Sequence, residues 1–148
     1  MNLKNYTSTV PAITTLANIE ALLIVAGAQA VAKEIKNRTV IALMFQLDCG
    51  GRLQTIRLPA NVDAVQECLW KEHVSNSTRN RRTKDDFREQ AERTAWKIML
   101  DWAQVQISLI KLKQADPLQV FLAYVYDGNQ TYYEYLKGNQ FKALPAPQ

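Results

Sequence analysis

The chain has 148 residues, of which 47% are hydrophobic and 22% charged, a composition typical of globular proteins and unlike that of disordered chains. Eighteen Lys and Arg against fourteen Asp and Glu give a net charge of +4, which favours anionic partners without requiring one. A single histidine, His73, and two cysteines without CxxC spacing argue against a zinc site. We expect one compact domain (1–148) with a β-rich half (1–60), a helical half (61–125) and a C-terminal extended segment and tail (126–148).

The β-rich half begins with a predicted strand followed by a helix. The stretch NYTSTV (5–10) is rich in β-branched and aromatic residues and stops at Pro11, so we expect a short strand there. In 12–28, apolar residues recur at intervals of three and four, which predicts a helix. The threonines at 14 and 15 are placed to cap its N-terminus, and Gly27 supplies a left-handed stop.

Three further strands are predicted before residue 60. The segments 30–35 and 39–47 flank the tight turn KNR and form a predicted β-hairpin. Two glycines in DCGGR supply the next turn, after which 53–59 alternates and ends at Pro59. Its alternation places Leu53, Thr55 and Arg57 on one face and Gln54, Ile56 and Leu58 on the other. The predicted fold is therefore α+β, with a small antiparallel or mixed sheet in the order β-α-β-β-β.

The helical half contains a second helix and the longest periodic pattern of the chain. Asn61 is placed to cap a helix over 61–74, which leads into a basic loop. From Ala91, apolar residues step by four and three over about three heptads, which predicts a long C-terminal helix with one buried seam. A second apolar row lies beside it, and either a partner subunit or the sheet and the preceding helix could cover the surplus. The seam comprises Ala91, Ala95, Ile98, Trp102, Val105, Leu109 and Leu112, and the second row comprises Trp96, Met99, Ala103 and Ile110.

The chain after the long helix is predicted to be less regular. Pro117 breaks or kinks the helix, and we expect a short helix over 118–126 followed by a DGN turn and irregular or extended structure. Alternation in YYEY suits a strand that covers the long helix, so the tyrosines at 124, 126, 132, 133 and 135 are predicted to pack in the core or at an edge rather than form a stacking platform.

The sequence offers no convincing catalytic constellation. Asp85, Asp86 and Glu89 could ligate a metal, but carboxylates in the first turn of a helix are more simply explained by its positive end. Cys68 and His73 are five apart on the second helix and face different ways. We therefore expect no enzyme, no metal and no cofactor.

Basic residues near aromatic ones are the strongest functional signal. Four cations fall between the two predicted helices, and a fifth continues the row one turn on. Such clusters bind phosphates by charge and present aromatic faces to bases. The alternative is a solvated face, because nearby Asp and Glu lie within reach of these cations. The predicted nucleic-acid contacts are Arg79, Arg81, Arg82, Lys84 and Arg88, with Arg93 and Lys97 beside Trp96 on the long helix.

A resemblance rests on residues of the long helix and the segment after it. Ala91, Arg93, Ala95, Trp96 and Lys97 match an Ala-x-Arg-x-Ala-Trp-Arg-like motif. With Trp102 and Gln106, and then Phe121, Leu122 and Tyr124, this half of the chain resembles a family of small uncharacterised proteins encoded by bacteriophages and prophages. Lys97 departs from the family's second arginine and Ala123 from its proline, while the stretches YTSTVPAITTLANIEALL and IRLPANV also fit the family's early half.

The resemblance implies an accessory protein that works in the cytoplasm of a bacterial host. We expect a non-enzymatic homo-oligomer, associated through the long helix, that binds single-stranded nucleic acid through its basic loop, with no signal peptide and no membrane span. The alternative is a counter-defence protein that sequesters a cyclic nucleotide or occupies a host effector. That sponge requires convergent arginines in a closed pocket, for which Arg57 and Arg93 are the candidates. Trp96 and Lys97 are predicted as further contacts of the ligand.

Overall fold

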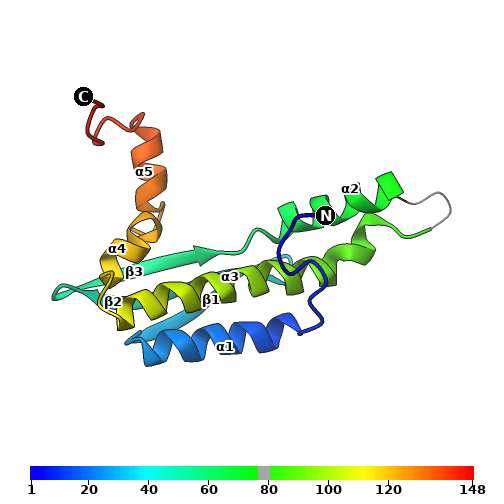
Figure 1. Cartoon of the computed structure of the whole chain (residues 1–148), viewed down its shortest axis with the longest axis horizontal. Helices are drawn as coiled ribbons and strands as arrows, with labels where there is room; N and C mark the ends of the chain where they lie inside the picture. The colour runs from blue at the N-terminus through cyan, green and yellow to red at the C-terminus, as the bar shows by residue number, and fades with distance from the viewer. Residues whose placement is uncertain (77–80) are drawn as a thin grey trace.

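The computed structural model describes residues 1–76 and 81–148 and shows an α+β fold built on a three-stranded antiparallel sheet (Figure 1). The strands are hydrogen-bonded in the order β1-β2-β3, with one helix before them and the other helices after them. The elements are α1 (Ala12–Val25), β1 (Ala30–Lys36), β2 (Thr39–Cys49), β3 (Arg52–Pro59), α2 (Val62–Asn76), η1 (Lys84–Phe87), α3 (Arg88–Lys111), α4 (Pro117–Phe121), η2 (Leu122–Tyr124) and α5 (Tyr132–Gly138).

The predicted first strand is wrong. Residues 5–10 form a turn and irregular chain, with Asn5 at a positive φ of 62°. Their carbonyl groups accept hydrogen bonds from side chains of α3: Gln90 Nε2 donates to Tyr6 O and Ser8 O, and Thr94 Oγ1 donates to Asn5 O, each at 3.0 Å. This segment is thus held by a helix instead of a neighbouring strand, so the predicted β-α-β-β-β order is wrong and the sheet keeps three strands.

The helix α1 confirms the predicted helix but not its predicted cap. Pro11 occupies the N-cap position without a side-chain hydrogen bond, and Thr14 and Thr15 lie inside the first turn. Thr15 is completely buried, and its Oγ1 finds no partner in the described part of the chain. At the other end, Gly27 has φ +106° and Ala28 N donates to Leu23 O at 2.9 Å, the left-handed termination that the glycine predicts.

Both predicted turns of the sheet are confirmed. Asn37 and Arg38 adopt positive φ between β1 and β2, as a two-residue hairpin turn requires, and Lys36 pairs with Thr39 across it. Gly50 and Gly51 form the corresponding turn between β2 and β3. The predicted alternation of β3 also holds, since Ile56 and Leu58 are buried.

The core lies between the sheet and α3, with α1 and α2 packed on either side of this helix (Figure 1). Trp96 is 1% exposed, and its Nε1 donates to Val40 O of β2 at 3.1 Å. The chain's own elements cover most of both predicted apolar rows of α3. The exceptions are Val105 and Leu112, which are 56% and 73% exposed near the C-terminal end of the helix.

The C-terminal residues form a projecting arm instead of an extended cover for α3. Residues 131–139, predicted to be irregular or extended, contain the helix α5, whose start is fixed by a reciprocal capping box between Thr131 and Glu134. The arm points away from the body on the opposite side of α3 from α1 (Figure 1). Its Tyr132, Tyr133 and Tyr135 are exposed, so their predicted packing is wrong. In the part of the chain that is described, no helix has the length and apolar character needed to cross a bilayer.

Candidate nucleic-acid interface

Exposed cations gather where α3 begins. We call this surface the basic end and define it by Arg81, Arg82, Lys84 and, on the β1–β2 turn, Lys36 and Arg38; all five are exposed. The turn belongs to it because Thr39, the residue after the turn, accepts a hydrogen bond from Arg88 at the start of α3 at 3.2 Å. Segments far apart in the sequence thus contribute positive charge to one surface.

Arg82 is stacked on an aromatic cluster. Its guanidinium carbon lies 4.4 Å from the centroid of the Phe87 ring, within the range of a cation–π interaction. The Phe87 ring lies 5.1 Å from the His73 ring and 6.2 Å from the Trp70 ring, and Trp70 and His73 are 5.8 Å apart. Trp70 and His73 are half-buried, so neither residue is completely covered by the chain.

Arg81 directly precedes Arg82 in the chain and is exposed. Neither Arg81 nor Arg82 forms an ion pair with any residue in 1–76 or 81–148. Arg79, the first cation of the predicted loop, lies outside the described residues. Arg81 and Arg82 are therefore the predicted contacts that keep a charge available to a ligand.

Lys84 and Arg88, also predicted as nucleic-acid contacts, are held by carboxylates of α2. The Lys84 ammonium pairs with Glu67, and its hydrogen bond lowers the pKa of that carboxyl group. Arg88 Nη1 donates to Asp63 Oδ1 at 2.6 Å, and this bond holds the pKa of Asp63 below its usual value. The same guanidinium donates to Gln66 Oε1 at 3.0 Å and to Thr39 Oγ1 at 3.2 Å, so Arg88 ties α3 to α2 and to the sheet.

The residues predicted for a small-ligand pocket do not converge. Arg57 Nε donates to Glu34 Oε2 at 2.8 Å, on the face of β3 opposite the buried Ile56 and Leu58. Arg93 Nη1 donates to Glu89 Oε1 at 2.8 Å on α3. The other two predicted residues are also occupied: Trp96 is buried against β2, and Lys97 Nζ lies 3.7 Å from Asp101 Oδ1.

Arg57 does border one open cavity of about 400 Å³. The cavity lies between the end of β3 and the start of the C-terminal arm. Arg57 is the single arginine among its lining residues, and Arg93 is not one of them. The lining consists of Arg57, Pro59, Ala123, Tyr124, Thr131, Tyr133 and Glu134.

Of the three acidic residues after the basic loop, Asp86 has the predicted capping role. Thr83 N donates to Asp86 Oδ2 at 2.7 Å, within a reciprocal capping box at the start of η1. Glu89 pairs with Arg93, as described above. Over 1–76 and 81–148, no group of three or more His, Cys, Asp and Glu is placed to hold a metal ion.

Sequence reasoning missed Trp70 and His73 as members of this surface. The two residues are three apart on α2 and so share a face. That spacing could have placed them beside the basic loop, but only the tertiary structure brings Phe87 and Arg82 onto them.

Comparisons of the chain with models of protein families, with curated proteins and with solved structures find no match. A functional assignment therefore depends on the residues of the basic end.

Proposed function

We propose that this protein binds single-stranded nucleic acid at the basic end, without catalysing a reaction. The observation that carries the proposal is Arg82, which is exposed and stacked on Phe87, whose ring lies beside the half-buried residues Trp70 and His73. Single-strand binders combine cations that hold phosphates with aromatic faces on which bases stack. Here Arg81, Arg82 and the cations of the β1–β2 turn supply the charge, and Trp70 and His73 supply the faces.

The expected site is small. Acidic residues balance much of the local charge, because Glu67 pairs with Lys84 and Asp63 with Arg88. Contact with about three phosphates would make log K fall with log salt by a slope of about −2, since each phosphate contributes about −0.7 for single strands. Such a shallow slope is expected of a short-site binder, whereas proteins that track a long strand show much steeper ones.

The test is a fluorescence-polarisation titration with labelled single-stranded DNA at two salt concentrations. The double variant Arg81→Ala/Arg82→Ala should lose at least about tenfold in affinity, because two charge-assisted contacts to phosphate are removed. The matched control is Lys137→Ala/Lys142→Ala, which removes the same charge from exposed positions in and after α5. Equal losses in both variants, or affinity that does not change with salt, would contradict the proposal.

A second candidate function rests on the cavity beside Arg57. Its volume of about 400 Å³ falls in the range of small-molecule sites, and it combines one guanidinium with tyrosines that could stack on a base. A counter-defence protein that captures a cyclic nucleotide could use it, with Arg57 as its cation and without Arg93. Mass spectrometry of small molecules released by heating the purified protein tests this. Release of a nucleotide by the wild type but not by Arg57→Ala would favour capture.

Both candidates suit an accessory protein of a bacteriophage or prophage that works in the bacterial cytoplasm, and that setting is part of the proposal. The supporting observations are the motif residues Arg93, Trp96 and Lys97 on α3 and the Phe121 and Tyr124 segment after it. Trp96 and Phe121 are buried and Arg93 is paired, so the motif describes mainly the packing of α3. The basic end, which carries the proposed binding, lies outside those motif positions.

A further inference from the structure

The helix α1 presents an uncharged face to solvent. The exposed fractions are 73% for Ile13, 59% for Ile24 and 72% for Val25. Glu20 is the helix's one charged residue, and Lys33 Nζ lies 3.2 Å from its Oε1 at the edge of the face. A helix that is apolar around most of its circumference is normally covered on more than one side. The exposed positions are Ile13, Thr14, Ala17, Asn18, Ala21, Ile24 and Val25.

We propose that α1 packs against α1 of a second copy of the chain in an antiparallel pair. Along the exposed face the large side chains Ile13 and Val25 stand at the ends, and the small Ala17 and Ala21 stand between them. This order reads the same in both directions. A two-fold interface requires such self-complementarity, because each subunit contributes the same patch in opposite orientation.

The positions of the large and small side chains define the register of the contact between the two helices. In an antiparallel arrangement Ile13 of one copy meets Val25 of the other, and Ala17 meets Ala21. The alanines allow the two helices to approach closely at the centre. Beside Ala21 and Val25, a groove of about 360 Å³ between α1 and α3 remains open to receive a large side chain from the second copy.

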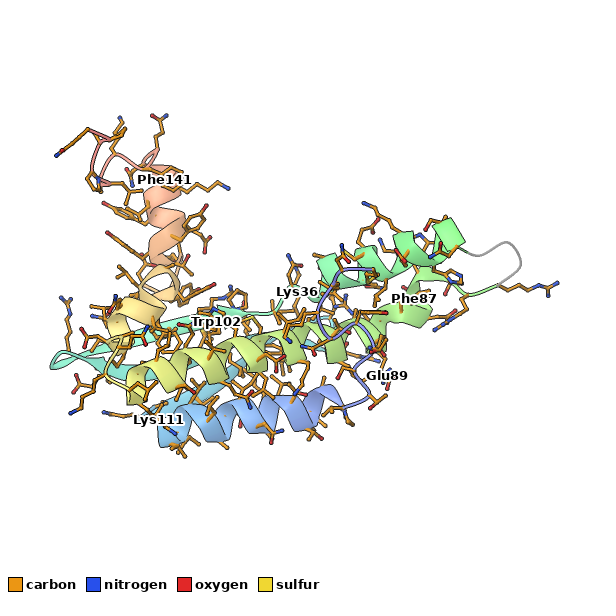
Figure 2. All side chains as sticks on the ribbon, viewed as in Figure 1. Lys36, Phe87, Glu89, Trp102, Lys111 and Phe141 are labelled. Atoms are coloured by element: carbon orange, nitrogen blue, oxygen red, sulfur yellow. The ribbon has the colours of Figure 1, made fainter. Side chains whose placement is uncertain are left out.

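Charges at the two ends of α3 complement the same arrangement. The helices α1 and α3 run side by side in the same direction (Figure 1). Figure 2 shows Glu89 and Lys111 at opposite ends of α3. The Glu89 side chain, which also pairs with Arg93 of its own chain, is 84% exposed, and Lys111 borders the groove beside α1. A two-fold axis across the centre of α1 therefore brings the Lys111 end of each copy toward the Glu89 end of the other.

Other occupants of this face agree less well with the structure. The chain's own arm lies on the opposite side of α3 (Figure 1), so it does not cover α1. A helix that lies on a membrane surface is normally rich in Lys and Arg on its polar side, and α1 contains neither. A second copy of the chain would cover the uncharged face of α1 and would also place opposite charges near Glu89 and Lys111.

The experiment is sedimentation-velocity analysis of the full chain over a range of concentrations up to tens of micromolar. The wild type should be a dimer. Ala21→Glu should be a monomer with an unchanged circular-dichroism spectrum, because its site is exposed on the surface of a single chain. Its thermal midpoint should fall only by the contribution that dimerisation makes to the wild type. The control Val74→Glu places the same charge on an exposed apolar position of α2 and should remain a dimer. A monomeric wild type, a dimeric Ala21→Glu, or loss of the dimer in both variants would overturn the proposal.

The orientation is tested separately by charge reversal. Glu89→Lys and Lys111→Glu should each weaken dimerisation, because each puts like charges at the ends of α3 that face each other in the antiparallel pair. The double variant restores opposite charges and should recover most of the wild-type dimer. A double variant no better than either single variant would overturn the antiparallel pairing. Neither experiment involves nucleic acid, so the outcome is independent of the proposed binding function.

Discussion

The two sides of η1 carry similar arginines with opposite structural roles. Before it, Arg81 and Arg82 are exposed and make no ion pair with a described residue. After it, the side chains of Arg88 and Arg93 are only 29% and 24% exposed, and each donates to a carboxylate. The difference shows that residue type alone does not make a cation available to a ligand. What decides is whether the fold places a carboxylate within reach.

The largest effect is expected at Trp96, which the sequence predicted as a ligand contact and the structure buries. Trp96→Ala should lower the free energy of unfolding by about 3–5 kcal/mol, because it leaves a large cavity between α3 and the sheet and an unpaired Val40 carbonyl. Urea denaturation followed by circular dichroism measures the loss. The matched variant Trp70→Ala removes a half-buried ring and should cost clearly less. A loss at Trp96 of under about 1 kcal/mol would mean that its burial contributes little to the core.

Local sequence signals were sufficient for most of the regular elements. The KNR and DCGGR turns, the glycine at the end of α1 and Asn61, whose Oδ1 accepts from Ala64 N at 3.0 Å, each depend on neighbouring residues only. The failures are segments whose structure depends on distant partners. Residues 5–10 have strand-forming side chains, but Gln90 and Thr94 of α3 satisfy their carbonyls and replace a strand partner.

The same limit applies to the candidate site and to the arm. The basic loop was visible in the sequence, but its division into available and paired cations was not, because Glu67 and Asp63 reach it from another helix. In the arm, the tyrosine alternation favoured a strand, whereas the capping box of Thr131 and Glu134 favoured a helix. The capping box decides the local structure because none of the strands among the described residues pairs with 132–135.

Arg88 offers the next test of the comparison across η1. Arg88→Ala should lower the free energy of unfolding by about 2 kcal/mol, since it removes charged hydrogen bonds that join α3 to α2 and the sheet. Arg81→Ala should stay within about 0.5 kcal/mol of wild type. Binding should show the reverse order, with the greater direct loss at Arg81. Thermal unfolding and DNA titration of both variants measure the two effects. Equal destabilisation by both would remove the distinction between paired and available arginines.

The smallest effect is expected at Asp101, which anchors the N-terminal segment to α3. Partial burial opposes ionisation of this carboxyl group, but hydrogen bonds from Asn5 and Lys4 and the charge of Lys97 outweigh it, so the pKa is lowered. A group whose pKa is lower in the folded state stabilises the fold above its unfolded pKa of about 3.9 and loses that contribution as the pH falls through the folded value.

Asp101→Asn should therefore cost about 1 kcal/mol at pH 7 and progressively less between pH 5 and pH 3. Urea unfolding at several pH values measures this convergence of the variant with the wild type. The control Asp85→Asn changes an exposed carboxylate in η1. Because Asp101 holds the segment that the sequence predicted as a strand, a constant difference across the pH range would mean that its negative charge plays no part in holding that segment. If the free energies of unfolding of the variant and the wild type converge at low pH, the charge of Asp101 stabilises the contact of residues 1–8 with α3. This contact then takes the place of the strand pairing that the sequence predicted.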